Sequence, residues 1–438
     1  KKKKKRNTFR FQTASIKTTL TDESDKSDKT RNIMKWYEYS AAFVMLYPGV
    51  MSVYWTLSGL LYFLLWERRK GKPVFGGDAP MVSILIPCFN EADNLDASIP
   101  HLLRLTYPNY ELIFINDGSK DDTLSILRRW EAESDKITVL DQKNGGKASA
   151  MNHGARCARG KYIVGIDGDA VPDYGALEYI VETLEKRPDV GAITGNPRVR
   201  NRSTILGKLQ VAEFSSIIGL IKRSQSLAGT LFTVSGVIMC IRKDVWRQIG
   251  GWSENMITDD IDISWKTQLH GYEIMYEPRA LCWVLMPETI RGLYKQRLRW
   301  AQGGAEVILK YSREVWHLKN IRLWPLYFEY VVTLIWAYLL FAFFFVSIAQ
   351  AIGGTVDLTP LKLGSLATFI AFLIQLSVSI YIDSRYEGKL LRYFISCIWY
   401  PYVFWMINSL TLVHGFPKAL LRDKNRKATW TSPDRGIQ

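Results

Sequence analysis

The chain has 438 residues, a hydrophobic share of 47%, an aromatic share of 13% and a net charge of +15. This length is greater than that of one ordinary small domain, so the chain can contain a soluble domain and a second region. The positive charge does not indicate a nucleic-acid-binding protein, because the basic residues gather beside apolar segments, at 67–72, 291–299 and 418–427, where they suit anionic lipid headgroups.

Residues 1–32 are polar, begin with "KKKKKR" and contain no apolar run, so we expect a disordered basic tail and no cleavable signal. The next segment, 41–66, carries no charge and has the length of about 20 residues that a helix needs to cross a bilayer. The basic run directly after it predicts that the middle of the chain lies in the cytoplasm. None of the five cysteines forms a CxxC pair, which fits a reducing compartment.

Strands and helices alternate along residues 80–287. The predicted strands are 81–87, 110–116, 137–140, 162–166 and 190–194, and the predicted helices are 91–105, 121–133, 147–158 and 174–186. Short continuous apolar runs are typical of strands buried on both faces. The alternation predicts an α/β domain with a doubly wound, mostly parallel sheet, and such sheets bind ligands beyond the C-terminal ends of their strands.

Acidic residues follow three of these strands: Glu91 the first, Asp117 the second, Asp167 and Asp169 the fourth. Each motif alone could be an ordinary turn. Acids gathered at one edge, however, repel one another unless a cation or a hydroxyl-rich ligand meets them. One or two aspartates, a diphosphate and water are the usual ligands of Mg²⁺. Lys147 follows two glycines at a helix start, where it is either a diphosphate contact or a solvated lysine.

The stretch "SENMITDDIDISW" over 253–265 predicts a helix with Thr258 as its N-cap and three acids in its first turn. It is either a helix start alone or also a reaction centre. A metal, a diphosphate and a ribose-sized ligand together describe a nucleotide-sugar. Transfer of that sugar to a hydroxyl needs a carboxylate base, which this stretch can supply.

A further helix is predicted over 288–304, at the start of an amphipathic interface region over 288–324. Gln296, Arg299 and Trp300 are three and four residues apart and share one face, where an indole can stack on a sugar and a guanidinium can bind phosphate. We expect Arg291, Lys295 and Arg297 to be available for headgroups or phosphate. The alternative is a basic helix that only anchors the chain at the membrane.

The region 325–414 contains three more uncharged segments, 330–352, 364–382 and 393–413. Four spans in all would leave the basic tail over 415–438 outside, which the positive-inside rule disfavours. Pro401 indicates that 393–413 could instead be broken or re-entrant. The number of crossings stays open at this point.

Four motifs, "DGS", "DGD", "TDD" and "QRLRW", followed by membrane segments, resemble the processive family-2 glycosyltransferases, which include cellulose, chitin and hyaluronan synthases. Longer stretches, among them "TVSGV" and "WTSPDRG", are similar to the bacterial poly-β-1,6-N-acetylglucosamine synthases from about residue 45 to the end. The resemblance implies a GT-A-like fold and a small membrane partner subunit.

The resemblance also implies roles for individual residues. Glu91 and Asp117 would contact uridine, Lys147 the diphosphate, and Asp260 would be the general base. Asp167 and Asp169 would hold Mg²⁺ or Mn²⁺, with Asp169 the more direct ligand. Gln296, Arg299 and Trp300 would close over the donor and the acceptor. Thr258 and Asp259 complete the substrate-binding triplet, which in the family is usually Thr-Glu-Asp, so Asp259 is one methylene shorter than the usual residue.

We therefore expect an inverting, processive glycosyltransferase that polymerises N-acetylglucosamine from UDP-GlcNAc into a growing polysaccharide and helps export it. We expect a multi-pass protein of the bacterial cytoplasmic membrane, in contact with the lipid bilayer, with a cytoplasmic catalytic domain and no nucleic-acid partner. Two alternatives remain: a synthase of another linkage, and a non-catalytic membrane scaffold that binds UDP-sugars.

Overall fold

The computed structural model describes residue 36, residues 38–68, 71–352 and 359–423, and residue 427. The tail expected over 1–32, and the end of the tail expected over 415–438, lie outside the described residues. The chain divides into two compact units, Lys1–Met51 with Tyr338–Ile370 and Ser52–Ala337 with Ala371–Gln438. The second unit contains the sheet and all residues of the candidate site.

Within the described residues, one eight-stranded sheet has the order β3-β2-β1-β4-β7-β6-β8-β5. The strands are β1 (Val82–Cys88), β2 (Tyr110–Asp117), β3 (Ile137–Gln142), β4 (Tyr162–Ile166), β5 (Val171–Pro172), β6 (Val190–Val199), β7 (Ile238–Arg242) and β8 (Glu273–Val284). β1 pairs in parallel with β2 and β4, and β2 with β3, which confirms the predicted arrangement. β7 runs antiparallel between β4 and β6, so the complete sheet is mixed.

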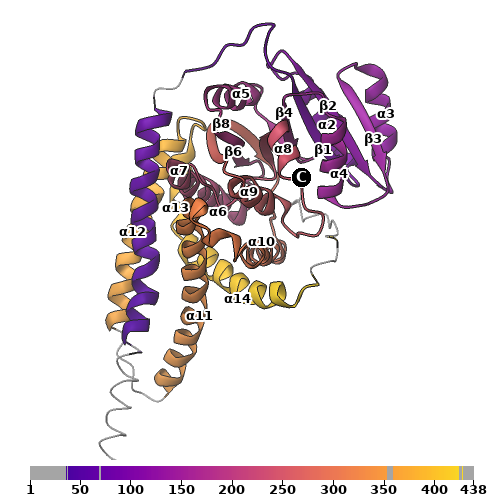
Figure 1. The fold of residues 1–438 in the computed structure, drawn as a ribbon. Helices are drawn as coiled ribbons and strands as arrows, with labels where there is room; N and C mark the ends of the chain where they lie inside the picture. Colours follow the sequence, from indigo (N-terminus) through magenta and orange to yellow (C-terminus); the bar gives the residue numbers. More distant parts are fainter. Residues whose placement is uncertain (1–35, 37, 69–70, 353–358, 424–426, 428–438) are drawn as a thin grey trace, which may run out of the picture. The chain divides into compact units, whose positions relative to one another are not determined.

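Helices cover both faces of the sheet, as the doubly wound prediction requires (Figure 1). Leu95, Leu127 and Ile180 belong to one hydrophobic cluster on one face, from α2 (Ala92–Leu102), α3 (Thr123–Glu133) and α5 (Ala176–Lys186). Met151, Val245 and Ile263 belong to the cluster on the other face, from α4 (Lys147–Cys157), α8 (Lys243–Gln248) and α9 (Asp259–Leu269). β1 and β2 are buried along their whole length, because both faces are covered.

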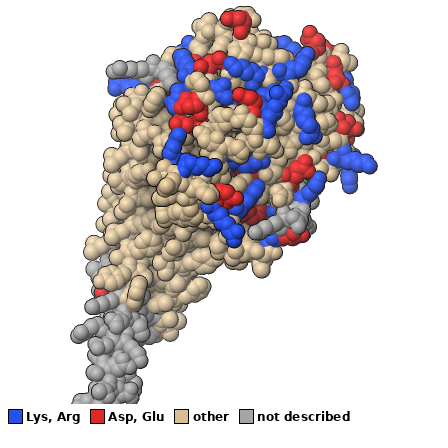
Figure 2. Space-filling model, in the orientation of Figure 1, with Lys and Arg blue, Asp and Glu red and all other residues tan. Residues whose placement is uncertain are grey.

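Three helices among the described residues are long and apolar enough to cross a membrane: Glu38–Glu67, Leu318–Ala349 and Leu363–Asp383. The last two overlap α11 (Trp324–Ile352) and α12 (Thr359–Asp383). Within the first unit, Thr368 donates a hydrogen bond to the Met45 carbonyl at 2.7 Å, and Gly364 lies against the Met45 side chain. Figure 2 shows the charged side chains over the sheet and its helices, whereas the long helices show mostly uncharged surface.

The fourth expected span, 393–413, is not one of these three helices. It is divided among η5 (Leu390–Tyr393), α13 (Phe394–Cys397), a π-helical turn η6 (Pro401–Trp405) and the start of α14 (Met406–Leu421). Pro401 stands at the first position of η6. The segment is therefore broken, as one of the two sequence-based alternatives stated.

α14 packs along α10 (Ile290–Lys310), and both belong to the second unit (Figure 1). A Cβ built on Gly415 would lie 2.9 Å from the Gln302 amide nitrogen, so the helices approach closely at this glycine. The remaining elements before β7 are α6 (Ile205–Ala212), the π-helical segment η2 (Glu213–Gly219) and α7 (Leu220–Leu227). After α10 come two short 3-10 turns, η3 (Glu314–Trp316) and η4 (Leu318–Leu323).

A buried ion-pair network joins two of the apolar helices to the sheet domain. The Arg223 guanidinium on α7 donates to both Glu67 oxygens, at 2.8 and 3.0 Å, and to Asp383 Oδ1 at 2.9 Å. Arg198 on β6 donates to Asp383 Oδ2 at 3.1 Å. Glu67 and Asp383 each end their helix, so these two helix ends meet at one place in the domain.

Candidate active site

The C-terminal ends of β1, β2 and β4 bring the predicted acids to one edge of the sheet. Asp117 is the last residue of β2 and is fully buried. Its carboxylate accepts from the Gly145 amide at 2.8 Å, the Gly146 amide at 2.9 Å and Gln142 Nε2 at 2.8 Å. Asp117 thus holds the glycine turn that starts α4 and places Lys147. Its expected contact with uridine stays a prediction.

Glu91 and the Asp167–Asp169 segment lie side by side. The Glu91 side chain is buried, accepts from Asn94 at 3.2 Å, and borders Gly168, where an added Cβ would lie 3.4 Å from Glu91 Cδ. Asp167 and Asp169 are both partly exposed directly after β4. The edge therefore combines a buried carboxylate with two that a ligand can reach.

Lys147 connects this edge to the opposite wall of the site. Its ammonium donates to Asp167 Oδ1 at 2.5 Å and to the Gly236 carbonyl at 3.3 Å. Burial alone would lower the pKa of Lys147, but the charges of Asp167, Asp259 and Asp260 outweigh it and hold this pKa above its ordinary value. The lysine is therefore a fixed cation between two groups of carboxylates, and the interpretation as a solvated helix-start lysine is wrong.

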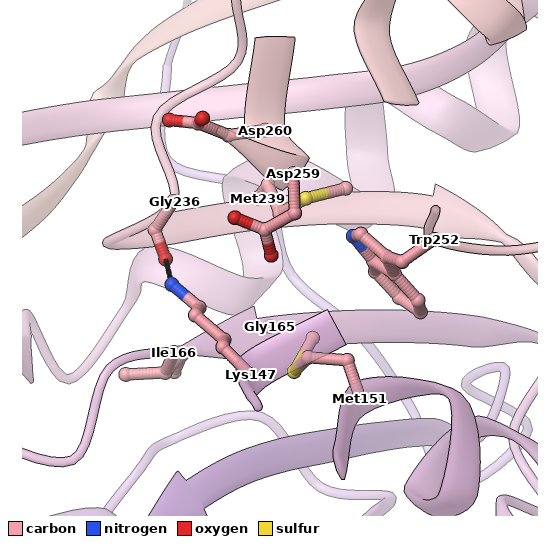
Figure 3. A pocket seen from close by; sticks show the side chains of 9 residues that line it. All are labelled: Lys147, Met151, Gly165, Ile166, Gly236, Met239, Trp252, Asp259 and Asp260. Carbon is pink, nitrogen blue, oxygen red and sulfur yellow. Dashed lines mark hydrogen bonds between the residues drawn. The ribbon is translucent and has the colours of Figure 1, made fainter. Parts of the chain in front are cut away.

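Asp259 and Asp260 reach the same pocket from the first turn of α9. The pocket is lined by Lys147, Met151, Gly165, Ile166, Gly236, Met239, Trp252, Asp259 and Asp260. Figure 3 shows Lys147 and Asp259 pointing toward the same space, with Gly236 beside the lysine. A Cβ built on Gly236 would lie 3.2 Å from Lys147 Nζ and 3.5 Å from Asp260 Oδ2. Glycine at this position lets the two charged groups share one site.

Burial raises the pKa of Asp260 to about 6, with help from the charge of Asp259. The charges of Lys147 and Arg299 and a hydrogen bond from the Ile261 amide, at 3.0 Å, act in the opposite direction. A carboxylate with a pKa near neutrality, in a pocket and beside a cation, has the properties of a general base.

Thr258 is the N-cap residue of α9, as predicted, but its side chain makes no cap hydrogen bond. Its hydroxyl is buried and has no hydrogen-bond partner among the described residues. A Cβ built on Gly303 of α10 would lie 2.7 Å from Thr258 Cβ and closer still to Oγ1. The threonine therefore packs against α10, and this contact fixes the start of α9 relative to the helix with the Gln296–Trp300 motif.

Asp262, the third acid of this stretch, belongs to the packing of α9 and not to the pocket. It is fully buried, and its Oδ1 accepts from Lys310 Nζ at 2.6 Å and from the Tyr311 hydroxyl at 2.9 Å. The stretch is thus both a helix start and part of a polar site, divided between different acids.

α10 confirms the helix predicted over 288–304 and extends to Lys310. Arg299 is exposed, and its charge acts on Asp260. The buried Gln296 Oε1 has no hydrogen-bond partner among the described residues. The expectation that Arg297 is available for headgroups is wrong: it is buried, pairs with Glu213 at 2.5 Å and lies 4.2 Å from the Trp300 ring centroid. Arg297 holds the tryptophan, and Arg291 and Lys295 remain exposed.

The loop between α7 and β7 contributes to the site, although sequence patterns predict no role for it. Side chains from α7, α9 and β6 accept hydrogen bonds from four of its amides: Leu231 to Gln268, Phe232 to Gln225, Val234 to Ser264 and Ser235 to Thr194, at 2.8 to 3.0 Å. The loop is irregular yet fixed, and it places Gly236 in the pocket. The one signal in the sequence is the polar "TVSGV" directly before an apolar strand.

The acids at the strand ends suit a hard divalent cation that takes part of its ligands from a substrate. No group of three or more acidic, histidine or cysteine side chains that could hold a metal alone occurs among the described residues. Asp167 and Asp169 lie two positions apart in the chain, and both are partly exposed. Oxygen donors of this kind fit Mg²⁺ or Mn²⁺, which commonly complete their coordination with phosphate and water.

Comparison with known proteins gives a consistent result. Residues 79–303 match the family model "Glycosyltransferase like family 2". A poly-β-1,6-N-acetyl-D-glucosamine synthase of Staphylococcus epidermidis is 42% identical over 405 residues, which cover 90% of this chain and 98% of the relative. One of Staphylococcus aureus strain MSSA476 is 40% identical over 404 residues, with the same coverage of 90% and 98%. A mannosyltransferase of Pyrobaculum calidifontis, solved with GDP-Man and Mn²⁺, is 22% identical and shares the fold, with a TM-score of 0.59 over 86% of this chain and 99% of that one.

Proposed function

The chain belongs to glycosyltransferase family 2, and from this membership we propose that it polymerises N-acetylglucosamine from UDP-GlcNAc into poly-β-1,6-N-acetylglucosamine. The names of the two staphylococcal relatives support the donor sugar and the linkage. The observation that carries the proposal is the place of Lys147, between Asp167 at the strand ends and Asp259–Asp260 at the start of α9. A leaving-group side and a base side thus face each other across one pocket.

In the proposed reaction, Asp260 takes the proton of the acceptor hydroxyl. The oxygen of that hydroxyl attacks the anomeric carbon of the donor from the side opposite the diphosphate, the bond from this carbon to the diphosphate oxygen breaks, and UDP leaves. An α-linked donor thereby gives a β-linked product. The ammonium of Lys147 and the guanidinium of Arg299 offset negative charge on the leaving diphosphate.

Asp169 and Asp167 would hold a divalent cation with the donor, and such a cation, when bound, neutralises charge on the leaving diphosphate. We assign Glu91 and Asp117 to the uridine end of the donor, beside the turn that Asp117 holds. Gln296 and Trp300 would contact the sugars from α10, with Thr258 and Asp259 at the start of α9. Asp259 lies near enough to act on both Lys147 and Asp260, which supports a role for the residue that replaces the usual glutamate.

We further propose a bacterial cytoplasmic-membrane location with the catalytic domain on the cytoplasmic side. Three spans, in place of four, put the basic tail on the same side as the catalytic domain, which agrees with the positive-inside rule. The meeting of Glu67 and Asp383 at Arg223 supports this arrangement, because both helices end at that domain. Export of the polymer along these helices and a small membrane partner subunit remain parts of the proposal.

The test is incorporation of radiolabelled N-acetylglucosamine from UDP-GlcNAc by the purified full chain, with and without Mg²⁺ or Mn²⁺. Asp260→Asn is expected to reduce polymer formation by a factor of about 10² to 10⁴, because it removes the base, while UDP-GlcNAc binding is kept. Asp96→Asn is the matched control, since the Asp96 side chain is 56% exposed on α2, and it is expected to have normal activity.

Two other outcomes would select other functions. Polymer that resists a hexosaminidase specific for β-1,6 linkages would indicate a synthase of another linkage. Equal polymer formation by the wild type and Asp260→Asn would favour a scaffold that binds UDP-sugars without catalysis.

A further inference from the structure

Lys222 is a buried lysine that forms no ion pair among the described residues. It lies on α7, the residue is 6% exposed, and its ammonium donates to the Thr194 hydroxyl at 3.3 Å. Its neighbour Arg223 is also buried but has two carboxylate partners, Glu67 and Asp383. Burying an ammonium without a partner is costly. The structure thus leaves hydrogen-bonding capacity of Lys222 unused within the described part of the chain.

The surroundings of Lys222 connect it to the candidate active site. The Thr194 hydroxyl that holds it also accepts from the Ser235 amide at 2.8 Å. Ser235 precedes Gly236, which lines the pocket between Lys147 and Asp260. Burial lowers the pKa of Lys222 to about 7, and the charge that opposes this effect is that of Asp260. The electrostatic neighbour of Lys222 is therefore the proposed general base.

The two lysines of the site have different partners. Lys147 pairs with Asp167 on the side assigned to the diphosphate. Lys222 shares the Thr194 hydroxyl with the Ser235 amide, and its one described hydrogen bond is to this neutral group. A group with spare N–H donors beside the base suits a ligand that carries oxygen acceptors but no negative charge. The hydrogen-bond acceptors of an N-acetylglucosamine polymer are all of this uncharged kind, and its hydroxyl and acetamido oxygens are among them.

We propose that Lys222 is an acceptor-binding residue, whose ammonium donates hydrogen bonds to hydroxyl or acetamido oxygens of the acceptor sugar next to Asp260. This assignment rests on the proposed function and adds a specificity residue outside its sequence motifs. The lysine holds the neutral sugar, and Asp260 takes the proton from its attacking hydroxyl. Hydroxyls of the donor sugar have the same chemistry, so the experiment must separate the two sugars.

The experiment uses the purified full chain in detergent and measures two constants. UDP-GlcNAc binding in the presence of Mn²⁺ gives a donor Kd by calorimetry. UDP release at saturating UDP-GlcNAc, with increasing concentrations of a short β-1,6-linked N-acetylglucosamine oligosaccharide, gives an acceptor KM. Lys222→Met keeps most of the apolar stem and removes the donors. It is expected to raise the acceptor KM about tenfold to a hundredfold, as loss of a charged hydrogen bond does, with the donor Kd unchanged.

Lys243→Met is the matched control, because Lys243 is a half-buried lysine on α8 whose ammonium bonds the Ala158 carbonyl, away from the pocket. It is expected to leave both constants unchanged. Lys222→Arg retains the charge and is expected to recover part of the acceptor affinity. If Lys222→Met does not fold, the comparison is made between Lys222→Gln and Lys222→Arg, where a higher acceptor KM for glutamine is expected.

An unchanged acceptor KM in the folded variants overturns the proposal. A donor Kd weakened as much as the acceptor KM is raised also overturns it and assigns Lys222 to the donor sugar. Failure of the proposed function gives a different result: the wild-type chain would then release no UDP from UDP-GlcNAc with any acceptor. In that case the donor Kd and the acceptor KM are measured with the UDP-sugar that the wild type does transfer. An acceptor KM that Lys222→Met leaves unchanged again overturns the proposal.

Discussion

At the scale of single residues, the surroundings of Asp260 act on its pKa in opposite directions. Burial and the charge of Asp259 favour its neutral form, whereas Lys147 and Arg299 favour the carboxylate. The outcome, a pKa of about 6, leaves the group ionised at neutral pH but far more basic than an ordinary aspartate. This balance can be tested through the pH dependence of the reaction and through stability.

We expect polymerisation to require ionised Asp260. As the pH decreases from 7, the rate should fall through a midpoint near the Asp260 pKa of about 6, because the base becomes protonated. Arg299→Met should move this midpoint upward, since it removes a charge that lowers the pKa, and the shift should be less than about one pH unit because Arg299 is exposed and screened. Values of kcat/KM, determined from initial rates between pH 5 and 8, measure the midpoint of the wild type and its shift in Arg299→Met. A midpoint below pH 5 would contradict the assignment.

The same pKa has a consequence for stability. A carboxyl group whose pKa is raised on folding binds its proton more tightly in the folded state, so it costs stability once the pH exceeds its unfolded value of about 3.9. Asp260→Asn removes that cost. We therefore expect an equal or higher Tm for this variant at pH 8, measured by thermal unfolding in detergent, despite its loss of activity. A large decrease in Tm would show that Asp260 has a structural role.

At the scale of elements, the site depends on how α9 and α10 meet. Thr258 at the start of α9 occupies the space above Gly303, where α10 has no side chain. Asp260, two residues after Thr258, and the Gln296–Trp300 motif on α10 are thereby held in one arrangement.

Two adjacent glycines of α10 provide a matched pair of variants. A Cβ on Gly303 would overlap Thr258, whereas a Cβ on Gly304 would lie 3.4 Å from Tyr330 Cε2, near ordinary contact. We expect Gly303→Ala to displace the start of α9, to cost about 1–3 kcal/mol and to reduce polymer formation at least tenfold. Gly304→Ala should be neutral or stabilising, because alanine favours helix. Equal activity of the two variants in UDP-release assays would show that the contact does not matter.

Sequence patterns predicted those elements best whose apolar periodicity is local. Strands β1 to β4, helices α2 to α5, the start of α9 at Thr258 and the helix at 288–304 follow from such patterns, whereas the short strand β5 was not predicted. The patterns could not predict those features of the site that depend on contacts with residues far away in the chain. Arg297 is expected at the surface because its partner Glu213 is 84 residues away in the chain. No role is predicted for the loop before β7, because side chains from three other elements accept its amides. Lys222 is recognised only because no described carboxylate forms an ion pair with it.

At the scale of the whole molecule, the Arg223 network attaches the catalytic domain to two apolar helices. Its members are buried, so each charge depends on the others for compensation. Such a network contributes little net stability compared with an apolar core, but removing one partner lowers the free energy of unfolding strongly.

Arg223→Met should therefore cost about 3–5 kcal/mol, because it leaves Glu67 and Asp383 buried with less compensation. The double variant Arg223→Met/Glu67→Gln should recover part of this loss. Lys186→Met breaks an ion pair in which the lysine side chain is 72% exposed and should cost less than about 1 kcal/mol. Unfolding temperatures of the three variants in one detergent test the ranking. Equal temperatures for Arg223→Met and Lys186→Met would contradict it.

The sequence positions of that network have a consequence for biosynthesis. Glu67 leaves the ribosome long before Arg223, and Asp383 later still, after two more apolar helices have been translated. The guanidinium therefore has a single carboxylate partner, Glu67, until Asp383 becomes available. The domain therefore acquires its final charge balance only after Asp383 has left the ribosome. Ribosome-bound chains that still hold residue 383 inside the ribosome should be more sensitive to protease than chains that have released it.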